Sequence, residues 1–177
     1  MTYMHIGATR IMGPAACSRV LLVGEDNPLS VEPEYALYME PNGCAGHRLQ
    51  SKILGVDARR TYLAMWRTNL CVGGWDEQDA MDRAVELGAL YGEPAPWSLI
   101  VMLGVKVAKA FRRAGVADVQ PFGMVVRDID RGGHRTFVSL PHPSGRNTVW
   151  NDPAKVAGAR ALLKQVASDV PWGELDQ

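Results

Sequence analysis

The sequence predicts an α/β protein: a single domain of three layers, α/β/α, with helices on both faces of a mostly parallel central sheet. Short runs of aliphatic and β-branched residues alternate with amphipathic segments through most of the chain, as in folds built from strand–helix–strand units. Clusters of glycine, proline, asparagine and aspartate separate these segments. A length of 177 residues with 47% hydrophobic content suits one substantial core. We therefore take residues 1–177 as a single domain.

The first predicted strand lies near the start of the chain. Residues 1–18 have no clear period, so we expect an irregular lead-in there. Residues 19–23 are aliphatic and β-branched, which favours a central strand. An acidic loop is expected at 24–30. The prolines and tyrosines of 32–42 indicate a loop that wraps around the fold.

A helix, a turn, a strand and a second helix are expected next. The apolar period predicts a helix over about 47–54 and a short helical turn at 57–62. The second strand lies within 62–70. After a pair of glycines, Asp76 can cap a helix that runs to about Leu87, with Met81, Ala84 and Leu87 facing inward.

The third strand is expected at 97–103, and Gly104 begins a helix that ends at about Arg113. The polar side of that helix carries Lys106, Lys109 and Arg113. Residues 122–126 and 135–140 flank a basic segment at 127–134, which is typical of a β-hairpin.

The last predicted element is a helix that opens at Asp152-Pro153, because proline suits the first helical turn. Its apolar face holds Val156, Ala159, Leu163 and Val166. We expect a loose tail over 171–177.

Composition narrows the possible functions. Lys+Arg and Asp+Glu both number 19, so the formal net charge is zero, unlike that of a general nucleic-acid binder. The three cysteines are far apart, which argues against disulfides and against a metal or iron–sulfur cluster. No apolar run could span a bilayer, and 1–17 lack a continuous apolar signal segment. We therefore expect a cytoplasmic protein with no membrane partner, no metal site and no cofactor.

One polar loop stands out as a candidate site. Residues 136–140 read as a buried strand, and Pro141-His142-Pro143-Ser144-Gly145-Arg146-Asn147 follows directly. The prolines remove backbone donors and prevent a helix from starting, and the glycine permits a turn or a close approach to a ligand. Ligands of α/β proteins bind at the carboxyl ends of strands. An ordinary proline–glycine turn is the alternative interpretation of this loop.

Three segments, in order, resemble the uracil-DNA glycosylase superfamily. Gly24-Glu25-Asp26-Asn27-Pro28 resembles its first motif, which is Gly-Gln-Asp-Pro-Tyr, Gly-Glu-Ala-Pro-Gly or Gly-Ile-Asn-Pro-Gly in different branches. Thr68-Asn69-Leu70-Cys71 is similar to the strand-end Thr-Asn segment, and His142-Pro143-Ser144-Gly145 is similar to the third motif. Residues 43–49 and 99–111 also resemble the iron–sulfur branch, so the resemblance covers most of 20–165.

The resemblance implies a uracil-DNA glycosylase-like fold and a monofunctional DNA glycosylase that removes uracil or a modified pyrimidine from DNA after base flipping. Two departures qualify this expectation. The cysteines that would bind an iron–sulfur cluster are missing, so no cluster is expected. The first motif has one residue more between Gly24 and Pro28 than those branches have. Asp26 matches when the count starts at Gly24, and Asn27 matches when it runs back from Pro28.

The resemblance also implies roles for individual residues. Breaking the glycosidic bond requires a group that activates water and a donor that stabilises the departing base anion. Asp26 is expected to activate the water; Asn27 is the alternative and would only position it. His142 would donate to the base carbonyl, and Asn69 would pair with the base edge. Gly24 and Glu25 would border the base, although Glu25 could equally bind a backbone N–H.

The remaining expected roles concern stacking and DNA contact. Tyr38 is the candidate stacking platform, with Tyr35 as the alternative. In the loop after the last strand, Arg146 occupies the place of the wedge that fills the gap left by the flipped base, and Ser144 would contact a phosphate. Gly145 and Asn147 complete this DNA-binding loop. Arg127, Arg131, His134 and Arg135 are expected to form a positive patch beside it.

Other interpretations fit the same residues. The scaffold could act on hypermodified pyrimidines or on free nucleotides, or it could transfer a base rather than hydrolyse the bond, which the zero net charge and the altered first motif favour. It could also bind unusual DNA without catalysis. A chance match of the motifs in another α/β protein is the last alternative.

Overall fold

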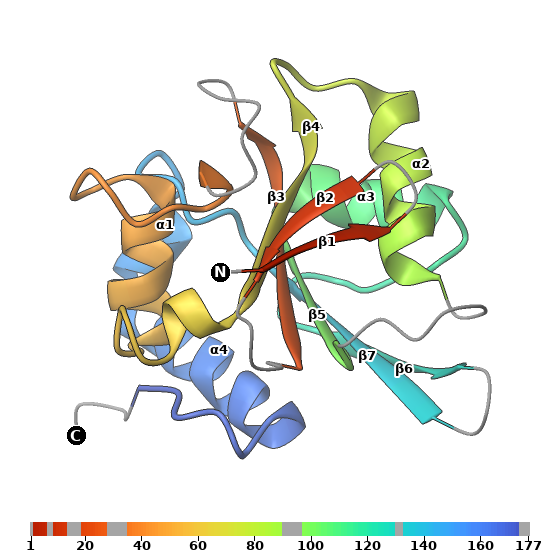
Figure 1. Ribbon diagram of the computed structural model, residues 1–177. Coiled ribbons are helices and arrows are strands. Elements are labelled where there is room, and N and C mark those ends of the chain that lie inside the picture. Colours follow the sequence, from red (N-terminus) through yellow and green to blue (C-terminus); the bar gives the residue numbers. More distant parts are fainter. Residues whose placement is uncertain are drawn as a thin grey trace.

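The computed structural model describes residues 2–6, 9–13, 19–27, 35–89, 97–129 and 133–173. In this part of the chain, a seven-stranded sheet has the order β1-β2-β4-β3-β5-β7-β6 (Figure 1). Its strands are β1 Thr2–Ile6, β2 Thr9–Gly13, β3 Val20–Asn27, β4 Trp66–Val72, β5 Leu99–Leu103, β6 Met124–Ile129 and β7 Gly133–Leu140.

The centre of the sheet is parallel and its flanks are antiparallel. β4, β3, β5 and β7 pair in parallel, whereas β1–β2, β2–β4 and β6–β7 are antiparallel. All five residues of β5 are buried, as expected for a central strand that is covered on both faces. The predicted α/β class and the mostly parallel sheet are therefore confirmed.

Helices cover both faces of the sheet. The helical elements are α1 Ala45–Arg48, which continues as the π-helix η2 Leu49–Leu54, then η3 Tyr62–Ala64, α2 Glu77–Gly88, α3 Val105–Arg113, η5 Thr148–Asn151 and α4 Pro153–Val166. α2 and α3 pack on one face, and η2 and α4 pack on the other (Figure 1). In the described part of the chain, no helix is long and apolar enough to cross a membrane.

The predicted helix starts are confirmed in detail. Asp76 accepts a hydrogen bond from the Asp79 backbone N–H at 2.9 Å and caps α2. Asp152 caps α4 in the same way through the Ala154 N–H at 2.9 Å. The buried face of α2 differs slightly from the prediction, because Ala80 is fully buried and Met81 only half-buried.

The prediction of an irregular lead-in over 1–18 is wrong for 2–6 and 9–13. These residues form an antiparallel hairpin, and Met12 of β2 pairs with Arg67 at the edge of β4. Strand addition of this kind uses backbone hydrogen bonds, so it needs no regular apolar alternation.

The predicted acidic loop at 24–30 is wrong over 24–27. β3 continues to Asn27, and Gly24, Asp26 and Asn27 pair with Asn69, Cys71 and Val72 of β4. The neighbouring strand satisfies the backbone of this polar segment, which therefore remains extended. Residues 28–30 lie outside the described part of the chain.

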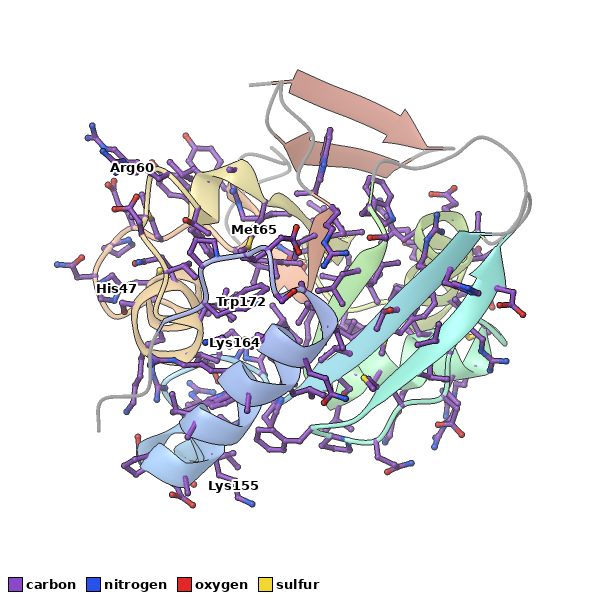
Figure 2. All side chains as sticks on the ribbon, turned by 90° about the horizontal axis from the view of Figure 1, so that it is seen from below. His47, Arg60, Met65, Lys155, Lys164 and Trp172 are labelled. Carbon is purple, nitrogen blue, oxygen red and sulfur yellow. The ribbon has the colours of Figure 1, made fainter. Side chains whose placement is uncertain are left out.

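The expectation of a loose tail from residue 171 is wrong for 171–173. Trp172 is buried, and its Nε1 donates to the Ala167 carbonyl at 2.8 Å. Gly173 N–H donates to the Leu54 carbonyl at 2.9 Å. Figure 2 places Trp172 at the end of α4 that carries Lys164. This segment closes one end of the core, and residues 174–177 lie outside the description.

Candidate functional site

The candidate site lies where four parallel strands end at one edge of the sheet. β3 carries Glu25 and Asp26 just before its last residue, Asn27; β4 carries Asn69, Gly104 follows β5, and His142 follows β7. Because these strands are parallel, their carboxyl ends share an edge, which is where α/β sheets bind ligands. The predicted gathering of these segments at one edge is therefore present.

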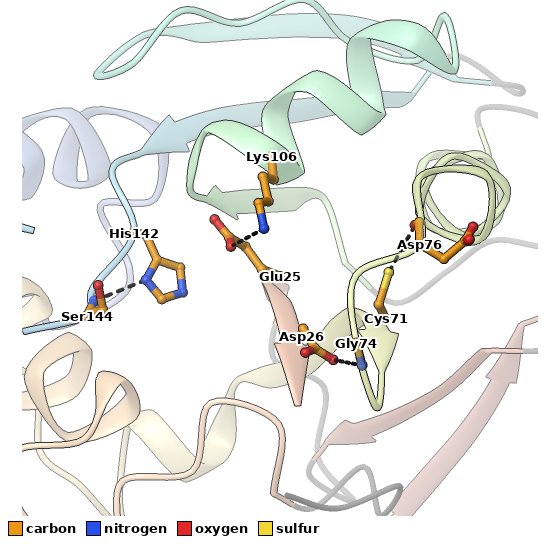
Figure 3. A network of polar contacts seen from close by, with 8 residues as sticks. All are labelled: Glu25, Asp26, Cys71, Gly74, Asp76, Lys106, His142 and Ser144. Carbon is orange, nitrogen blue, oxygen red and sulfur yellow. Dashed lines mark hydrogen bonds and ion pairs between the residues drawn. The ribbon is translucent and has the colours of Figure 1, made fainter. Parts of the chain in front are cut away.

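His142 is held by its own loop. Its Nδ1 accepts a hydrogen bond from the Ser144 backbone N–H at 3.2 Å (Figure 3). In the neutral ring, this acceptor role places the proton on Nε2. The His142 carbonyl accepts from Asn147 Nδ2 at 3.0 Å and from Trp150 Nε1 at 3.1 Å. Both the backbone and the tautomer of His142 are thus fixed, and Nε2–H contacts no partner among the described residues.

The surroundings of His142 favour its neutral form. Burial lowers the pKa of His142 below its usual value of 6.5; nearby Glu25 opposes this shift, and Lys106 adds to it. Desolvation disfavours the charged imidazolium, which is why burial has this sign. At neutral pH, the ring is therefore an uncharged donor through Nε2–H.

Glu25 lies between His142 and α3. Its Oε2 is 3.9 Å from Lys106 Nζ, and its side chain is 23% exposed (Figure 3). Lys106 Nζ also lies 5.3 Å from the centre of the Trp75 ring. A Cβ on Gly104 would approach Glu25 Oε1 to 2.5 Å and His142 Cβ to 3.3 Å, and Gly104 has a φ of +110°. A glycine at this position lets the carboxylate and the imidazole share one wall of the site.

Asp26 is directed elsewhere. Its Oδ1 accepts a hydrogen bond from Gly74 N–H at 3.2 Å, in the turn after β4 (Figure 3). Neighbouring residues of a strand point to opposite faces, so Glu25 is the carboxylate on the His142 side. The backbone of Asn27 pairs with Val72, and its side chain lies outside the description.

Asn69 packs directly over Gly24. It is 7% exposed, and a Cβ on Gly24 would lie only 2.1 Å from its Oδ1. Among the described residues, no group forms a hydrogen bond with its carboxamide.

The loop that carries Tyr38 lies against the same strand end. Leu37 Cδ2 would be 3.0 Å from a Cβ on Gly24. Tyr38 is half-buried and meets the exposed Tyr35 edge-on, with 6.0 Å between ring centres. The Tyr38 carbonyl accepts from Cys44 Sγ at 3.2 Å. Leu37, the neighbour of Tyr38 in this loop, is therefore the residue that borders the Gly24–Asn69 pair, and Tyr35 is exposed.

Part of the loop after β7 forms hydrogen bonds within the protein, and part of it is exposed. Asn147 uses both ends of its side chain internally: Oδ1 accepts from Val149 N–H at 3.2 Å, and Nδ2 donates to the His142 carbonyl. Arg48 Nη1 donates to the Ser144 carbonyl at 2.5 Å and ties the loop to α1. Gly145 and Arg146 are exposed.

The expected positive patch beside this loop is wrong. Arg127, His134 and Arg135 lie at the hairpin end of β6 and β7, whereas His142 follows the other end of β7. Arg135 is buried and donates to the Leu87 and Ala89 carbonyls. His134 lies 2.8 Å from an Asp128 carboxylate oxygen. Arg131 is outside the described residues.

A cavity of about 420 Å³ adjoins His142 on the α3 side. Its wall includes Glu25, His142 and a basic row on α3: Lys106, Lys109 and Arg112. The sequence predicted a polar side with Lys106, Lys109 and Arg113 for this helix and gave it no function. The third member is wrong for this cavity, because Arg112 borders it and Arg113 pairs with Glu77 instead. The three-residue spacing of the row was the available signal, because such residues share one side of a helix.

The described residues contain no group of three or more His, Cys, Asp or Glu that could hold a metal ion. Comparison with protein-family models finds no matching family. Comparison with curated proteins finds no matching relative.

Proposed function

We propose that this chain is a DNA glycosylase, which hydrolyses the N-glycosidic bond of uracil or a modified pyrimidine on a uracil-DNA glycosylase-like scaffold. The observation that carries the proposal is the presence of two polar side chains, His142 and Asn69, at the carboxyl edge of the parallel strands. His142 offers a fixed Nε2–H, and Asn69 offers a buried carboxamide without a partner among the described residues. Together, these two groups could form hydrogen bonds with a planar base that carries both a carbonyl oxygen and an amide edge.

His142 would stabilise the departing base. The base leaves as an anion whose charge grows on a carbonyl oxygen, and a preorganised donor there lowers the barrier. A neutral imidazole with a lowered pKa donates without requiring prior protonation. Loss of one such donor typically costs about 10²–10³ in rate, so we expect a loss of this size for His142→Ala.

Asn69 would read the base edge, because one carboxamide both donates and accepts. The base must leave the duplex to reach it. Tyr38 would be the stacking surface, because it follows Leu37 in the loop that borders the Gly24–Asn69 pair.

We assign water activation to Asp26, with Asn27 as a residue that could only position the water. The structure supplies a specific alternative in Glu25, because this carboxylate shares a wall with His142. The hydrogen bond from Gly74 N–H to Asp26 leaves the other carboxylate oxygen of Asp26 for a water. Asp26→Ala and Glu25→Gln variants separate the two assignments.

The test uses end-labelled oligonucleotides that carry uracil, 5-hydroxymethyluracil, thymine opposite guanine, or hypoxanthine, followed by alkali. Strand cleavage at one base, abolished by His142→Ala and by one carboxylate variant, supports the assignment. Lys164→Gln, on the far helix α4, serves as the control. If all four oligonucleotides stay intact at high enzyme concentration, the proposal fails for these bases.

Hypermodified pyrimidines or free nucleotides are the second candidate substrates. The zero net charge favours them, since a protein that binds DNA through its backbone is usually basic. Turnover of a mononucleotide with no action on DNA would select this function. Binding of unusual DNA without any turnover would select a non-catalytic role.

A further inference from the structure

The cavity beside His142 has a basic wall that the proposed base chemistry does not use. Lys106, Lys109 and Arg112 of α3 line it together with two carboxylates, Glu25 and Asp118. With His142 neutral, these side chains carry three positive and two negative charges. The lining of the cavity therefore has a net positive charge, although the formal net charge of the whole protein is zero.

Lys109 and Arg112 are the unsatisfied members of this row. Lys106 is 3.9 Å from Glu25, and the neighbouring Arg113 forms an ion pair with Glu77 on the α2 side. In the described part of the chain, neither Lys109 nor Arg112 has an ion-pair partner. Both side chains are exposed, and both border the cavity.

The dimensions of the row suit phosphate. Lys106 and Arg112 are six positions apart, which corresponds to about 9 Å along a helix. One strand of duplex DNA presents a phosphate about every 3.4 Å along its axis, so the row is longer than the axial spacing of two neighbouring phosphates. Arginine and lysine are the side chains that bind phosphate oxygens most strongly.

We propose that Lys109 and Arg112 bind a phosphate group of the substrate in this cavity while the base lies against His142. The inference rests on the proposed function, because it takes the substrate to be a nucleotide unit. His142 is a wall of both the cavity and the proposed base site, so the phosphate belongs to the reacting nucleotide or to one close to it. It is either a backbone phosphate of DNA or the 5′-phosphate of a free nucleotide.

The experiment compares the wild-type chain with Lys109→Gln/Arg112→Gln and with Arg113→Gln, which removes a charge of the same helix that does not border the cavity. One arm measures the Kd for a 20-base-pair duplex with a single uracil opposite guanine, between 50 and 200 mM salt. The other arm measures binding and turnover of 2′-deoxyuridine 5′-monophosphate and of 2′-deoxyuridine. Lys109→Arg/Arg112→Lys retains the charges and should retain the wild-type behaviour.

If the phosphate belongs to DNA, the double variant lowers the slope of log K against log salt by about 0.9, since one phosphate contact on duplex DNA contributes roughly that much. Over this salt range, the wild-type affinity then falls about 3- to 4-fold more than that of the variant. If it belongs to a nucleotide, only the monophosphate loses affinity, and the nucleoside is unaffected.

Equal effects of the double variant and Arg113→Gln, or no effect on either ligand, would overturn the phosphate site. Binding is measured independently of base removal. A lower salt slope in the double variant, together with no base removal by the wild type, would support the phosphate site and reject the glycosylase. Base removal by the wild type, together with an unchanged salt slope in the double variant, would support the glycosylase and reject the phosphate site.

Discussion

Replacing Gly24 with alanine should displace the Asn69 carboxamide. A Cβ at this position would lie 2.1 Å from Asn69 Oδ1 and 3.0 Å from Leu37 Cδ2, and the first distance is far below van der Waals contact. Asn69 is buried, so its amide has little room to move. Gly24→Ala therefore forces either a new rotamer of Asn69 or a shift of the Leu37 loop.

The expected cost follows from this overlap. Added methyl groups in well-packed interiors usually cost about 1–3 kcal/mol, and for a chain of this length each kcal/mol lowers Tm by about 2–4 °C. Asn69→Ala removes the overlapping oxygen. In that background, Gly24→Ala should cost less than in the wild type, with a coupling of about 1 kcal/mol, which is within the usual range for residues in contact.

The assay is a double-mutant cycle in urea unfolding, accompanied by cleavage of the oligonucleotide that the wild type prefers. Gly24→Ala should reduce cleavage about as much as Asn69→Ala does, by roughly 10- to 100-fold for the loss of a buried hydrogen bond. Additive stability effects would refute the packing argument. Full activity of Gly24→Ala would refute the role of the Asn69 amide in reading the base.

Three further predictions address the rest of the site and the fold. Activity that needs neutral His142 should fall as the pH drops through the pKa of this residue, which lies below 6.5. Glu25 raises this pKa, so Glu25→Gln should move the acidic limb of the pH–rate profile to lower pH. Asn147→Asp keeps the cap on Val149 N–H but loses the Nδ2 donor to the His142 carbonyl; it should lower activity with a stability loss of about 1 kcal/mol in urea unfolding, and unchanged kinetics would contradict the bracing role. Trp172→Ala should cost about 3–5 kcal/mol in the same measurement because the side chain is buried in the core, whereas a loss under 1 kcal/mol would mean that the tail is loose.

The parts of the fold that the sequence predicted well are those fixed by local chemistry. Asp76 and Asp152 are good helix N-caps because their side chains bond to nearby backbone N–H groups. The aliphatic runs of β3 and β5 favour buried strands in the centre of a sheet. The hairpin of β6 and β7 was also predicted, although residues 127–129 and 133–134, expected in its turn, belong to the strands. In each case, a few residues that are close together in the sequence determine which secondary structure forms.

The parts that it missed depend on partners distant in the chain. The polar end of β3 stays extended because β4 supplies its hydrogen bonds, and 9–13 become a strand because an edge of β4 is free to pair. Arg135 was expected to be solvated, yet it is buried and donates to carbonyls at the end of α2. Such pairings belong to the assembled sheet and leave no periodic signal.

The same holds within the candidate site. The sequence brought His142, Asn69 and the acidic strand end together, because the ends of parallel strands share an edge. It could not distinguish the directions of Glu25 and Asp26, since the side of a strand-end residue depends on where the strand stops. It also could not assign a cavity to the basic row of α3, because the opposite wall comes from residues further along the chain.

The parallel centre of the sheet also determines how the protein must fold. β3 pairs with β5 between residues separated by about 79 positions, as for Val20 and Leu99, and β7 joins only afterwards in the chain. Sheets with such distant pairings fold slowly, because closing a long loop costs conformational entropy before the strand contacts form that compensate for this cost. The groups proposed to act on the base come from β3, β4 and the segment after β7, so no partly folded form that lacks the last strand contains them all. Recovery of activity during refolding should therefore lag behind the return of helical signal and coincide with completion of the sheet.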